Sequence, residues 1–336
     1  MPGFLSFVRD QYATLELPRP STNISDATYI VTGANTGLGY ECAKHLFQMG
    51  AGRIIIAVRS RAKGEAALAT IRRETGRQSV GEVWDLDLSS LDSVEEFSKR
   101  IQQLDRLDAL IENAGVAMGK FQTLEGMEMS LYINVLSTML LALRALPKLQ
   151  ESAHKFGIRP NLVIVSSNTA LDDNIRLSAD QIDGDVFDTL STAKVFDVMT
   201  QYPRSKLLEI YAVRQLASLF PVSESGVTIN AVNPGMCYSE LDRNGNFRLR
   251  LLMAIMRALL ARSTEKGSRN LVQAAFAGSD SHGSYFSECR AKNEDLPTWI
   301  TDKDGKRVQE HIWADLLKRL ESTGHGVDIA SLRAKK

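Results

Sequence analysis

The chain has 336 residues, 44% of them hydrophobic, and its 40 Lys and Arg residues balance its 40 Asp and Glu residues. This apolar content is ample for a substantial core, and a formal net charge of zero gives no electrostatic reason to expect a nucleic acid or an anionic membrane as a partner. The three cysteines, Cys42, Cys237 and Cys289, are far apart and form no Cys-x-x-Cys pair, so we expect no disulfide framework, no metal site and a reducing, cytoplasmic location.

The N-terminal segment, residues 1–20, is interrupted by Arg9, Asp10 and Glu16. It lacks the continuous apolar run of a signal peptide or a membrane anchor. A later apolar run, residues 247–261, is too short and contains too many Arg residues to span a bilayer. We therefore expect no transmembrane segment.

The first chemical signal is a glycine-rich turn. After the apolar run Tyr29-Ile30-Val31 the chain reads Thr-Gly-Ala-Asn-Thr-Gly-Leu-Gly from Thr32 to Gly39, and an amphipathic stretch follows. This order predicts a strand, a tight turn and a helix whose positive N-terminal end can hold a pyrophosphate. The spacing is Gly-x-x-x-Gly-x-Gly, which differs from the better-known dinucleotide fingerprint and from the nucleotide-triphosphate loop. An ordinary glycine-rich turn is the alternative interpretation.

The rest of the chain alternates short apolar runs with longer helical patterns, which predicts an α/β fold with a doubly wound parallel sheet and helices on both faces. Strands are expected at residues 29–32, 53–58, 82–84, 109–112, 162–166, 228–232 and 285–286. Helices are expected at residues 40–49, 62–75, 91–103, 127–151 and 202–219. No repeat or composition break marks a boundary, so we expect a single domain over residues 1–336.

Polar motifs follow three of these strands. Asn113-Ala114-Gly115, Ser166-Ser167 and Asn233-Pro234-Gly235 each stand at the carboxyl end of a predicted strand. Ligands bind at this edge of an open parallel sheet, so the three motifs are expected to share one site with the glycine turn.

Tyr202 and Lys206 form a Tyr-x-x-x-Lys pair at the start of a predicted helix. Residues four apart lie on one helix face, and a nearby ammonium lowers the pKa of a phenol. Tyr202 could then exchange a proton with a carbonyl or alcohol oxygen. Alone the pair is weak evidence, since Tyr and Lys often fall four residues apart by chance.

Taken in order, these motifs resemble the short-chain dehydrogenase/reductase family over residues 28–286, with a C-terminal extension at 287–336. The resemblance implies a Rossmann-type fold with Tyr202 as general acid/base and Lys206 holding the nicotinamide ribose. It implies that Ser167 orients the substrate oxygen, with Ser166 as the close competitor. It also implies that Asn134 helps to hold the lysine and a proton-relay water.

The resemblance further assigns the residues that would hold a nicotinamide cofactor. They are Gly33, Asn35, Thr36, Gly37, Leu38, Gly39, Arg59, Lys63, Asp87, Leu88, Asn113, Ala114, Gly115, Tyr202, Lys206, Pro234, Gly235 and Ser239. Asp87 matches the family's adenine contact, although it could instead cap the next helix, a role for which Ser89 or Ser90 is better placed.

The turn after the second strand bears on the choice of cofactor, because an acidic residue there would bind the ribose hydroxyls of NAD. The chain has Arg59, Arg61 and Lys63 instead. The fork of Arg59 suits phosphate oxygens, so NADP is expected. Solvated charges at a helix start are the alternative, although the helix dipole disfavours cations there.

The spacing between Ser167 and Tyr202 departs from the compact family pattern, because residues 168–201 intervene and are rich in Asp and Thr. This layout resembles the retinol-dehydrogenase-like and protochlorophyllide-reductase-like branches. The inserted segment could form a lid or flank at the cleft, or an acidic surface insertion with no catalytic part.

The apolar, Arg-containing segment 247–261 is a second departure. In the family this region caps the substrate pocket, and we expect a cap over about residues 240–282. A basic amphipathic helix can also lie on a membrane surface. The tail beyond residue 288 could pack on the core or reach a second subunit of a homo-oligomer.

These features together predict an NADP-dependent oxidoreductase that transfers hydride between NADPH and a lipophilic ketone, aldehyde or alcohol. Carbonyl reduction is favoured, with a polyketide-like ketone as one candidate and a retinoid or lipid aldehyde, or an alcohol, as the alternative. A non-catalytic NADP-binding scaffold is a further alternative. It predicts damage to the catalytic group, yet Ser167, Tyr202, Lys206 and Asn134 are all intact.

Overall fold

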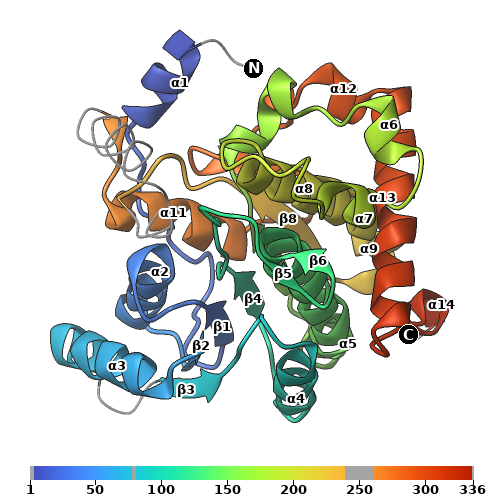
Figure 1. The fold of residues 1–336 in the computed structure, drawn as a ribbon. Helices are drawn as coiled ribbons and strands as arrows, with labels where there is room; N and C mark the ends of the chain where they lie inside the picture. The colour runs from blue at the N-terminus through green and yellow to red at the C-terminus, as the bar shows by residue number, and fades with distance from the viewer. Residues whose placement is uncertain (1–3, 78–80, 239–259, 335–336) are drawn as a thin grey trace.

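The computed structural model describes residues 4–77, 81–238 and 260–334, and its centre is an eight-stranded sheet with the order β10-β9-β8-β7-β4-β1-β2-β3 (Figure 1). The strands are β1 (Thr28–Thr32), β2 (Arg53–Val58), β3 (Glu82–Asp85), β4 (Ala109–Glu112), β7 (Asn161–Val165), β8 (Thr228–Val232), β9 (Tyr285–Ser287) and β10 (Arg290–Ala291). All neighbours pair in parallel except β9 and β10. The doubly wound sheet is confirmed, and each predicted strand is correct to within one residue at either end.

Helices cover both faces of this sheet. One face carries α2 (Gly37–Gln48), α3 (Arg61–Thr75) and α11 (Thr264–Ala275), and the other carries α4 (Leu91–Gln102), α5 (Thr138–Phe156) and α8 (Gln201–Leu219). Side chains alternate between the two faces along each strand. On β4, Leu110 packs toward the second group and Ile111 toward the first. Both faces of the sheet are therefore buried, which explains why the strands are nearly continuous runs of apolar residues.

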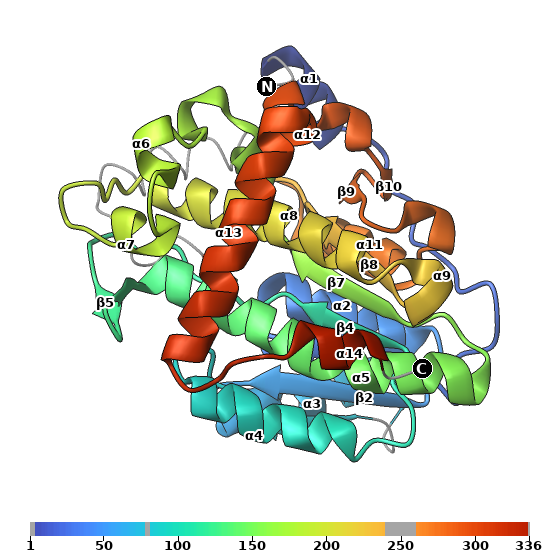
Figure 2. The same cartoon turned by 90° about the vertical axis from the view of Figure 1, so that its right-hand side faces the viewer.

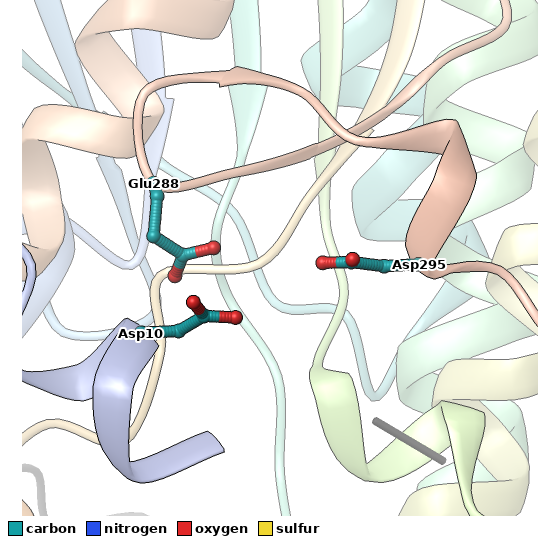
Figure 3. Close-up of side chains that lie close together, drawn as sticks. All are labelled: Asp10, Glu288 and Asp295. Atoms are coloured by element: carbon teal, nitrogen blue, oxygen red, sulfur yellow. The ribbon is translucent and has the colours of Figure 1, made fainter. Parts of the chain in front are cut away.

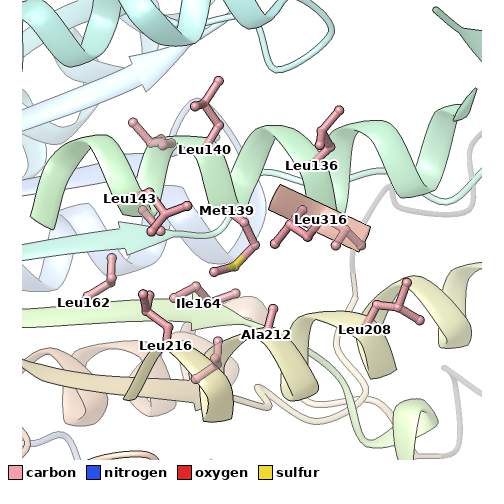
Figure 4. Close-up of a cluster of buried hydrophobic side chains, with 14 of the residues drawn as sticks. Leu136, Met139, Leu140, Leu143, Leu162, Ile164, Leu208, Ala212, Leu216 and Leu316 are labelled. Carbon is pink, nitrogen blue, oxygen red and sulfur yellow. The ribbon is translucent and has the colours of Figure 1, made fainter. Parts of the chain in front are cut away.

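The core under α5 and α8 is packed from several elements (Figure 4). Leu136, Met139, Leu140 and Leu143 meet Leu162 and Ile164 of β7 and Leu208, Ala212 and Leu216 of α8. Leu316 joins them from α13 (Lys303–Ser322), which crosses α8 (Figure 2). The C-terminal extension therefore completes the core of this face.

The helix predicted at residues 127–151 was wrong at its start. Glu125 and Gly126 have φ angles of 49° and 80° and turn the chain between β5 (Thr123–Leu124) and β6 (Met127–Glu128). The Glu128 carboxylate then accepts the backbone N–H groups of Ser130 (2.9 Å) and Leu131 (3.2 Å). A π-helical segment, η1 (Leu131–Ser137), follows before α5 begins. The local turn and the buried carboxylate override the apolar periodicity.

The inserted segment 168–201 folds into short helices: η2 (Asn168–Leu171), η3 (Asp173–Ile175), α6 (Ala179–Ile182) and α7 (Val186–Leu190). Its carboxylates bind the C-terminal extension, because Arg319 of α13 pairs with Asp185 (3.2 Å) and Asp188 (2.6 Å). In return, Asp315 of α13 accepts the backbone N–H of Val186 at 2.8 Å. The acidic residues thus tie the insertion down as a flank of the fold.

The predicted substrate cap covers about residues 240–282. Residues 240–259 lie outside the described residues. α11, within the remaining part, packs against α2 and the sheet. The cap over about residues 240–282 therefore stays a prediction.

The remaining described elements are peripheral. They are α1 (Phe4–Gln11), α9 (Val222–Ser225), η4 (Ser279–Ser281), η5 (Asn293–Asp295), α12 (Thr298–Thr301) and α14 (Ile329–Ala334). Arg144 of α5 donates to the carbonyl oxygens of His325 and Gly326, which holds the chain before α14. No helix in the described ranges combines the length and the apolar character needed to cross a bilayer.

Candidate active site

One cleft of about 790 Å³ opens at the carboxyl ends of the parallel strands and brings most of the predicted site residues together. Its walls include Gly33, Asn35, Thr36, Gly37, Leu38, Arg59, Lys63, Asp87, Leu88, Asn113, Ala114, Gly115, Ser167, Tyr202, Lys206, Pro234 and Gly235. Gly39 and Asn134 are not wall residues of this cleft. Ser239 lies outside the described residues.

Gly37 and Gly39 in the glycine turn are needed for two different reasons. Gly33 and Gly37 have φ angles of 65° and 63°, which side-chain-bearing residues rarely adopt. A Cβ on Gly37 would have no heavy atom within 4 Å, so the backbone there is open to a ligand. A Cβ on Gly39 would lie 2.6 Å from Asn113 Nδ2. Gly39 thus lets α2 pack closely on the turn, and Gly37 leaves room for a ligand.

Asn113 and Thr32 hold the turn to the neighbouring strand. Asn113 Nδ2 donates to the Thr32 carbonyl oxygen at 2.9 Å, and the Thr32 hydroxyl accepts the backbone N–H groups of Asn113 (3.0 Å) and Ala114 (2.9 Å). The ends of β1 and β4 are thereby fixed relative to each other, and so is the wall of the cleft.

Cations stand at the end of β2 where a 2′-phosphate is expected. Arg61 pairs with Asp85 through Nη2 (2.7 Å) and also donates to the Val83 carbonyl oxygen. Arg59 and Lys63 are exposed, line the cleft, and have no hydrogen-bond or ion-pair partner in the part of the chain that the structure describes. The two free cations therefore fit a phosphate group, whereas Arg61 is already engaged.

Asp87 lines the cleft just after β3, the strand next to β2. Its Oδ1 atom accepts the backbone N–H of Ser89 (2.9 Å) and the Ser89 hydroxyl (2.7 Å). Ser90 is the cap of α4, since its hydroxyl accepts the backbone N–H of Ser93 at 3.2 Å. Asp87 is therefore not the helix cap and stays available to a ligand in the cleft.

The two candidate serines point to different surroundings. Ser166 is buried and donates its hydroxyl to the Lys206 carbonyl oxygen at 2.9 Å. The Ser167 hydroxyl lies at the cleft, where it accepts the backbone N–H (3.3 Å) and the hydroxyl (3.0 Å) of Thr169. Burial raises the pKa of the nearby Tyr202 phenol, and the Ser167 hydroxyl opposes that rise. Of the two, Ser167 has the geometry expected of the residue that orients a substrate oxygen.

Lys206 is held more tightly than expected. Its Nζ atom donates to the Val165 carbonyl oxygen (2.8 Å) and to Glu209 Oε1 (2.7 Å), and lies 5.7 Å from the centre of the Tyr202 ring. Burial raises the pKa of Tyr202, and the Glu209 carboxylate raises it further. The lowering of this pKa by Lys206 stays a prediction.

Asn134 lies in η1 and binds backbone instead of the lysine. Its Oδ1 accepts the backbone N–H of Val116 (2.8 Å), and its Nδ2 donates to the Val116 carbonyl oxygen and the Ser205 hydroxyl, both at 2.9 Å. A Cβ on Gly115 would lie 3.1 Å from Asn134 Oδ1 and 3.6 Å from Lys206 Nζ. Asn134 therefore fixes the loop after β4 against α8, close to the lysine.

Glu112 and Glu209 were not among the predicted site residues, although their positions in the sequence could have indicated them. Glu112 is a carboxylate at the end of an apolar strand, directly before the Asn113-Ala114-Gly115 motif. Glu209 follows Lys206 by three residues and so lies on the same helix face. Both are buried, with exposed fractions of 3% and 1%.

A separate acidic cluster lies outside this cleft (Figure 3). Asp10, Glu288 and Asp295 bring their carboxylates together from three segments. Lys292 Nζ lies 3.0, 2.9 and 2.8 Å from oxygens of these three residues in turn, and Arg262 also pairs with Glu288. Cations of the chain itself thus neutralise the cluster, which ties α1 to the segment after β9.

Comparisons with known proteins agree with this geometry. A family model described as short chain dehydrogenase matches residues 27–180. The chain is 41% identical over 316 residues to the short chain dehydrogenase/reductase dmxR8 of Cryptosporiopsis sp., which covers 93% of this chain and 95% of the relative.

Two solved structures are similar in fold. A crystal structure of an uncharacterized protein from Mycobacterium Paratuberculosis has a TM-score of 0.64 at 22% identity, covering 91% of this chain and 96% of that one. The Pseudomonas aeruginosa RhlG/NADP active-site complex has a TM-score of 0.60 at 19% identity, covering 80% and 97%. At such identities the likeness shows the fold alone. The sequence relative and the fold together show that the chain belongs to the short-chain dehydrogenase/reductase family of oxidoreductases.

Proposed function

We propose that the protein is an NADP-dependent carbonyl reductase of the cytoplasm that acts on a lipophilic ketone or aldehyde. The observation that carries this proposal is the arrangement of Ser167, Tyr202 and Lys206 along the same cleft as the open backbone at Gly37. A phenol, a hydroxyl and an ammonium at one end of a dinucleotide-sized cleft can bind and protonate a carbonyl oxygen.

The preference for NADP is supported by the free cations at the end of β2. Arg59 and Lys63 line the cleft with no partner among the described residues, and the turn after β2, residues 59–61, carries no acidic residue that could bind ribose hydroxyls. The pyrophosphate would be held at the turn from Gly33 to Gly39 and the start of α2. The RhlG structure was determined with NADP.

The cofactor, when bound, supplies the hydride. The chain supplies the rest: Ser167 donates a hydrogen bond to the substrate oxygen, and Tyr202 delivers the proton to it. Lys206 provides positive charge beside Tyr202 and a donor toward the nicotinamide ribose. Asn134 keeps the loop and helix around this group in register.

The substrate is proposed to be apolar. Tyr238 is 51% exposed and lines the cleft together with Val116 and Met236. The sequence of residues 247–261, which lie mostly outside the described residues, is also rich in Leu, Ile and Met. A polyketide-like ketone is our first candidate. The long spacing between Ser167 and Tyr202 keeps a retinoid or lipid aldehyde, as in the retinol-dehydrogenase-like branch, as the second.

A substrate screen tests this function. The purified protein is assayed for NADPH oxidation against hydrophobic ketones, aldehydes and, in reverse, alcohols, with NADH in parallel and Tyr202→Phe as the background. We expect carbonyl-dependent NADPH oxidation that the variant lacks. Tight NADPH binding with no turnover of any compound would instead favour the scaffold alternative.

A further inference from the structure

Two buried carboxyl groups lie on the same side of the sheet as Lys206, and the proposed reaction does not use them. Glu209 lies on α8, and its Oε1 atom is 2.7 Å from Lys206 Nζ. Glu112 is the last residue of β4. With exposed fractions of 1% and 3%, neither carboxyl is solvated by bulk water.

The strand register explains why Glu112 faces this group. Glu112 pairs with Ile164 across β4 and β7, and Ile164 and Ser166 share one face of β7 because they are two residues apart. The Ser166 hydroxyl donates to the Lys206 carbonyl oxygen, and Ser166 also lies close enough to Glu209 to lower the pKa of that carboxyl. The four side chains therefore converge between α8 and the sheet.

The hydrogen bonding of this cluster is incomplete. Both carboxyl oxygens of Glu112 and the Oε2 atom of Glu209 are buried without a hydrogen-bond partner among the described residues. An isolated ionised carboxylate in such a place is very costly, so the group takes up a proton instead. Burial, then the charge of Glu209, raises the pKa of Glu112 well above its usual range. Glu112 therefore favours its protonated form.

The pKa of Glu209 is set by opposing effects. Burial raises its pKa, while the charge and hydrogen bond of Lys206 and the nearby Ser166 hydroxyl lower it, with a result of about 7. The titratable groups that bear on it are Lys206 and Tyr202 on its own helix and Glu112 on β4. From the described parts of β8, η1, η2 and α13, which also pack on α8, no charged side chain shifts this pKa.

We propose that Glu209 is a positioning residue that holds Lys206, and that gain or loss of a proton on Glu209 changes the net charge beside Tyr202 while Glu112 stays neutral. This inference rests on the proposed function only for its effect on catalysis. The pairing and the protonation states are properties of the protein itself and can be tested without turnover.

The sign of the effect follows from the charges. When Glu209 is ionised, it offsets the Lys206 ammonium and raises the pKa of Tyr202. When Glu209 is protonated, the ammonium acts alone and makes the phenol a stronger acid. Proton delivery to a carbonyl should therefore become faster as the pH falls through about 7.

Infrared spectroscopy of the protein without substrate tests the protonation states directly, because the C=O stretch of a protonated carboxyl is distinct and histidines do not contribute to it. Above the range where surface carboxyls titrate, we expect two protonated carboxyls in the wild type. One should be lost as the pH rises through about 7, and the other should persist. Glu209→Gln should abolish the step, and Glu112→Gln should remove only the persistent band.

Lys206→Met supplies a second variant, should Glu209→Gln fail to fold. Without the ammonium, ionised Glu209 loses its partner, so the step should move to higher pH. A step that stays in place in Lys206→Met, or that disappears in Glu112→Gln instead of Glu209→Gln, would overturn the assignment.

The pH profile of kcat/KM with NADPH then tests the coupling to catalysis. The wild type should gain about 3- to 10-fold between pH 8 and pH 6, whereas Glu209→Gln should be flat over this range and resemble the wild type at low pH. Exposed Glu224→Gln serves as the matched control and should retain the wild-type profile. An unchanged profile in Glu209→Gln would contradict the coupling. Lack of activity in every protein would count against the proposed function and leave the infrared result standing.

Discussion

The hydroxyl of Thr32 accepts the backbone N–H of Asn113 at 3.0 Å, which ties the end of β1 to the end of β4 where the glycine turn begins. Thr32 is 1% exposed, and its hydroxyl also accepts the N–H of Ala114. Thr32→Val keeps the side-chain shape and leaves these N–H groups without their acceptor, so we expect a loss of about 1–3 kcal/mol in the free energy of unfolding. Denaturant unfolding measures it, with Thr32→Ser as the control that keeps the hydroxyl. Equal stability of the two variants would show that this hydroxyl is not needed.

Gly37 and Gly39 should respond differently to alanine. Gly39→Ala places a Cβ against Asn113 Nδ2 and should lower stability by about 1–3 kcal/mol through overpacking. Gly37→Ala meets no atom within 4 Å but carries a φ of 63° and points into open space, so it should weaken NADPH binding more than it lowers stability. Thermal unfolding and cofactor titration separate the two effects. Wild-type NADPH affinity in folded Gly37→Ala would remove Gly37 from the cofactor site.

Arg59→Asp should shift the cofactor preference from NADPH toward NADH, because it removes a phosphate partner and places a carboxylate near the ribose. Since an ion pair of this kind contributes about 1–3 kcal/mol, the ratio of kcat/KM values should change by about 5- to 150-fold. Arg61→Ala is the matched control, because Arg61 pairs with Asp85 and should leave the ratio unchanged. The reverse order of the two variants would mean that Arg61 holds the phosphate.

Glu112→Leu should stabilise the protein, and the gain should depend on pH. The pKa of Glu112 is raised on folding, so above pH 4.5 the unfolded chain releases this proton while the folded chain keeps it, and stability falls as the pH rises. Leucine carries no such proton, so the advantage of the variant should grow by about 1.4 kcal/mol for each pH unit between pH 5 and the pKa in the folded protein. Urea unfolding at pH 5, 6 and 7 measures this, with Glu224→Gln as the control. A gain that does not change with pH would show that Glu112 is ionised in the folded protein.

Much of the fold could be predicted from the sequence because its signals are local. The strands are apolar runs bounded by turn residues, and the motifs at their ends predicted which side chains line one cleft. The turn from Thr32 to Gly39 could be predicted from the order of its glycines alone. Arg59 and Lys63 could be named as phosphate partners, but that Arg61 is engaged by Asp85 depends on the neighbouring strand.

The parts that could not be predicted depend on partners distant in sequence. The helix was predicted to begin at residue 127, but Glu125 and Gly126 turn the chain just before it. The spacing of apolar residues does not reveal such a turn. The position of the helix α13 could not be predicted, because it depends on contacts with α8 and with the inserted segment. The pairing of Lys206 with Glu209 could have been predicted, because residues three apart lie on the same helix face. The approach of Glu112 required the register of β4 against β7.

The central claim is that the hydroxyl of Tyr202 delivers the proton as hydride reaches the carbonyl carbon, and single-turnover reduction with saturating NADPH tests it most directly. Tyr202→Phe keeps the ring and removes only this hydroxyl, and Tyr40→Phe on α2 is the matched control. The account predicts that Tyr202→Phe binds NADPH with near-wild-type affinity while its single-turnover rate falls by about 10²- to 10⁴-fold, and that Tyr40→Phe is unaffected. A near-normal single-turnover rate in Tyr202→Phe with an authentic carbonyl substrate would contradict the mechanism.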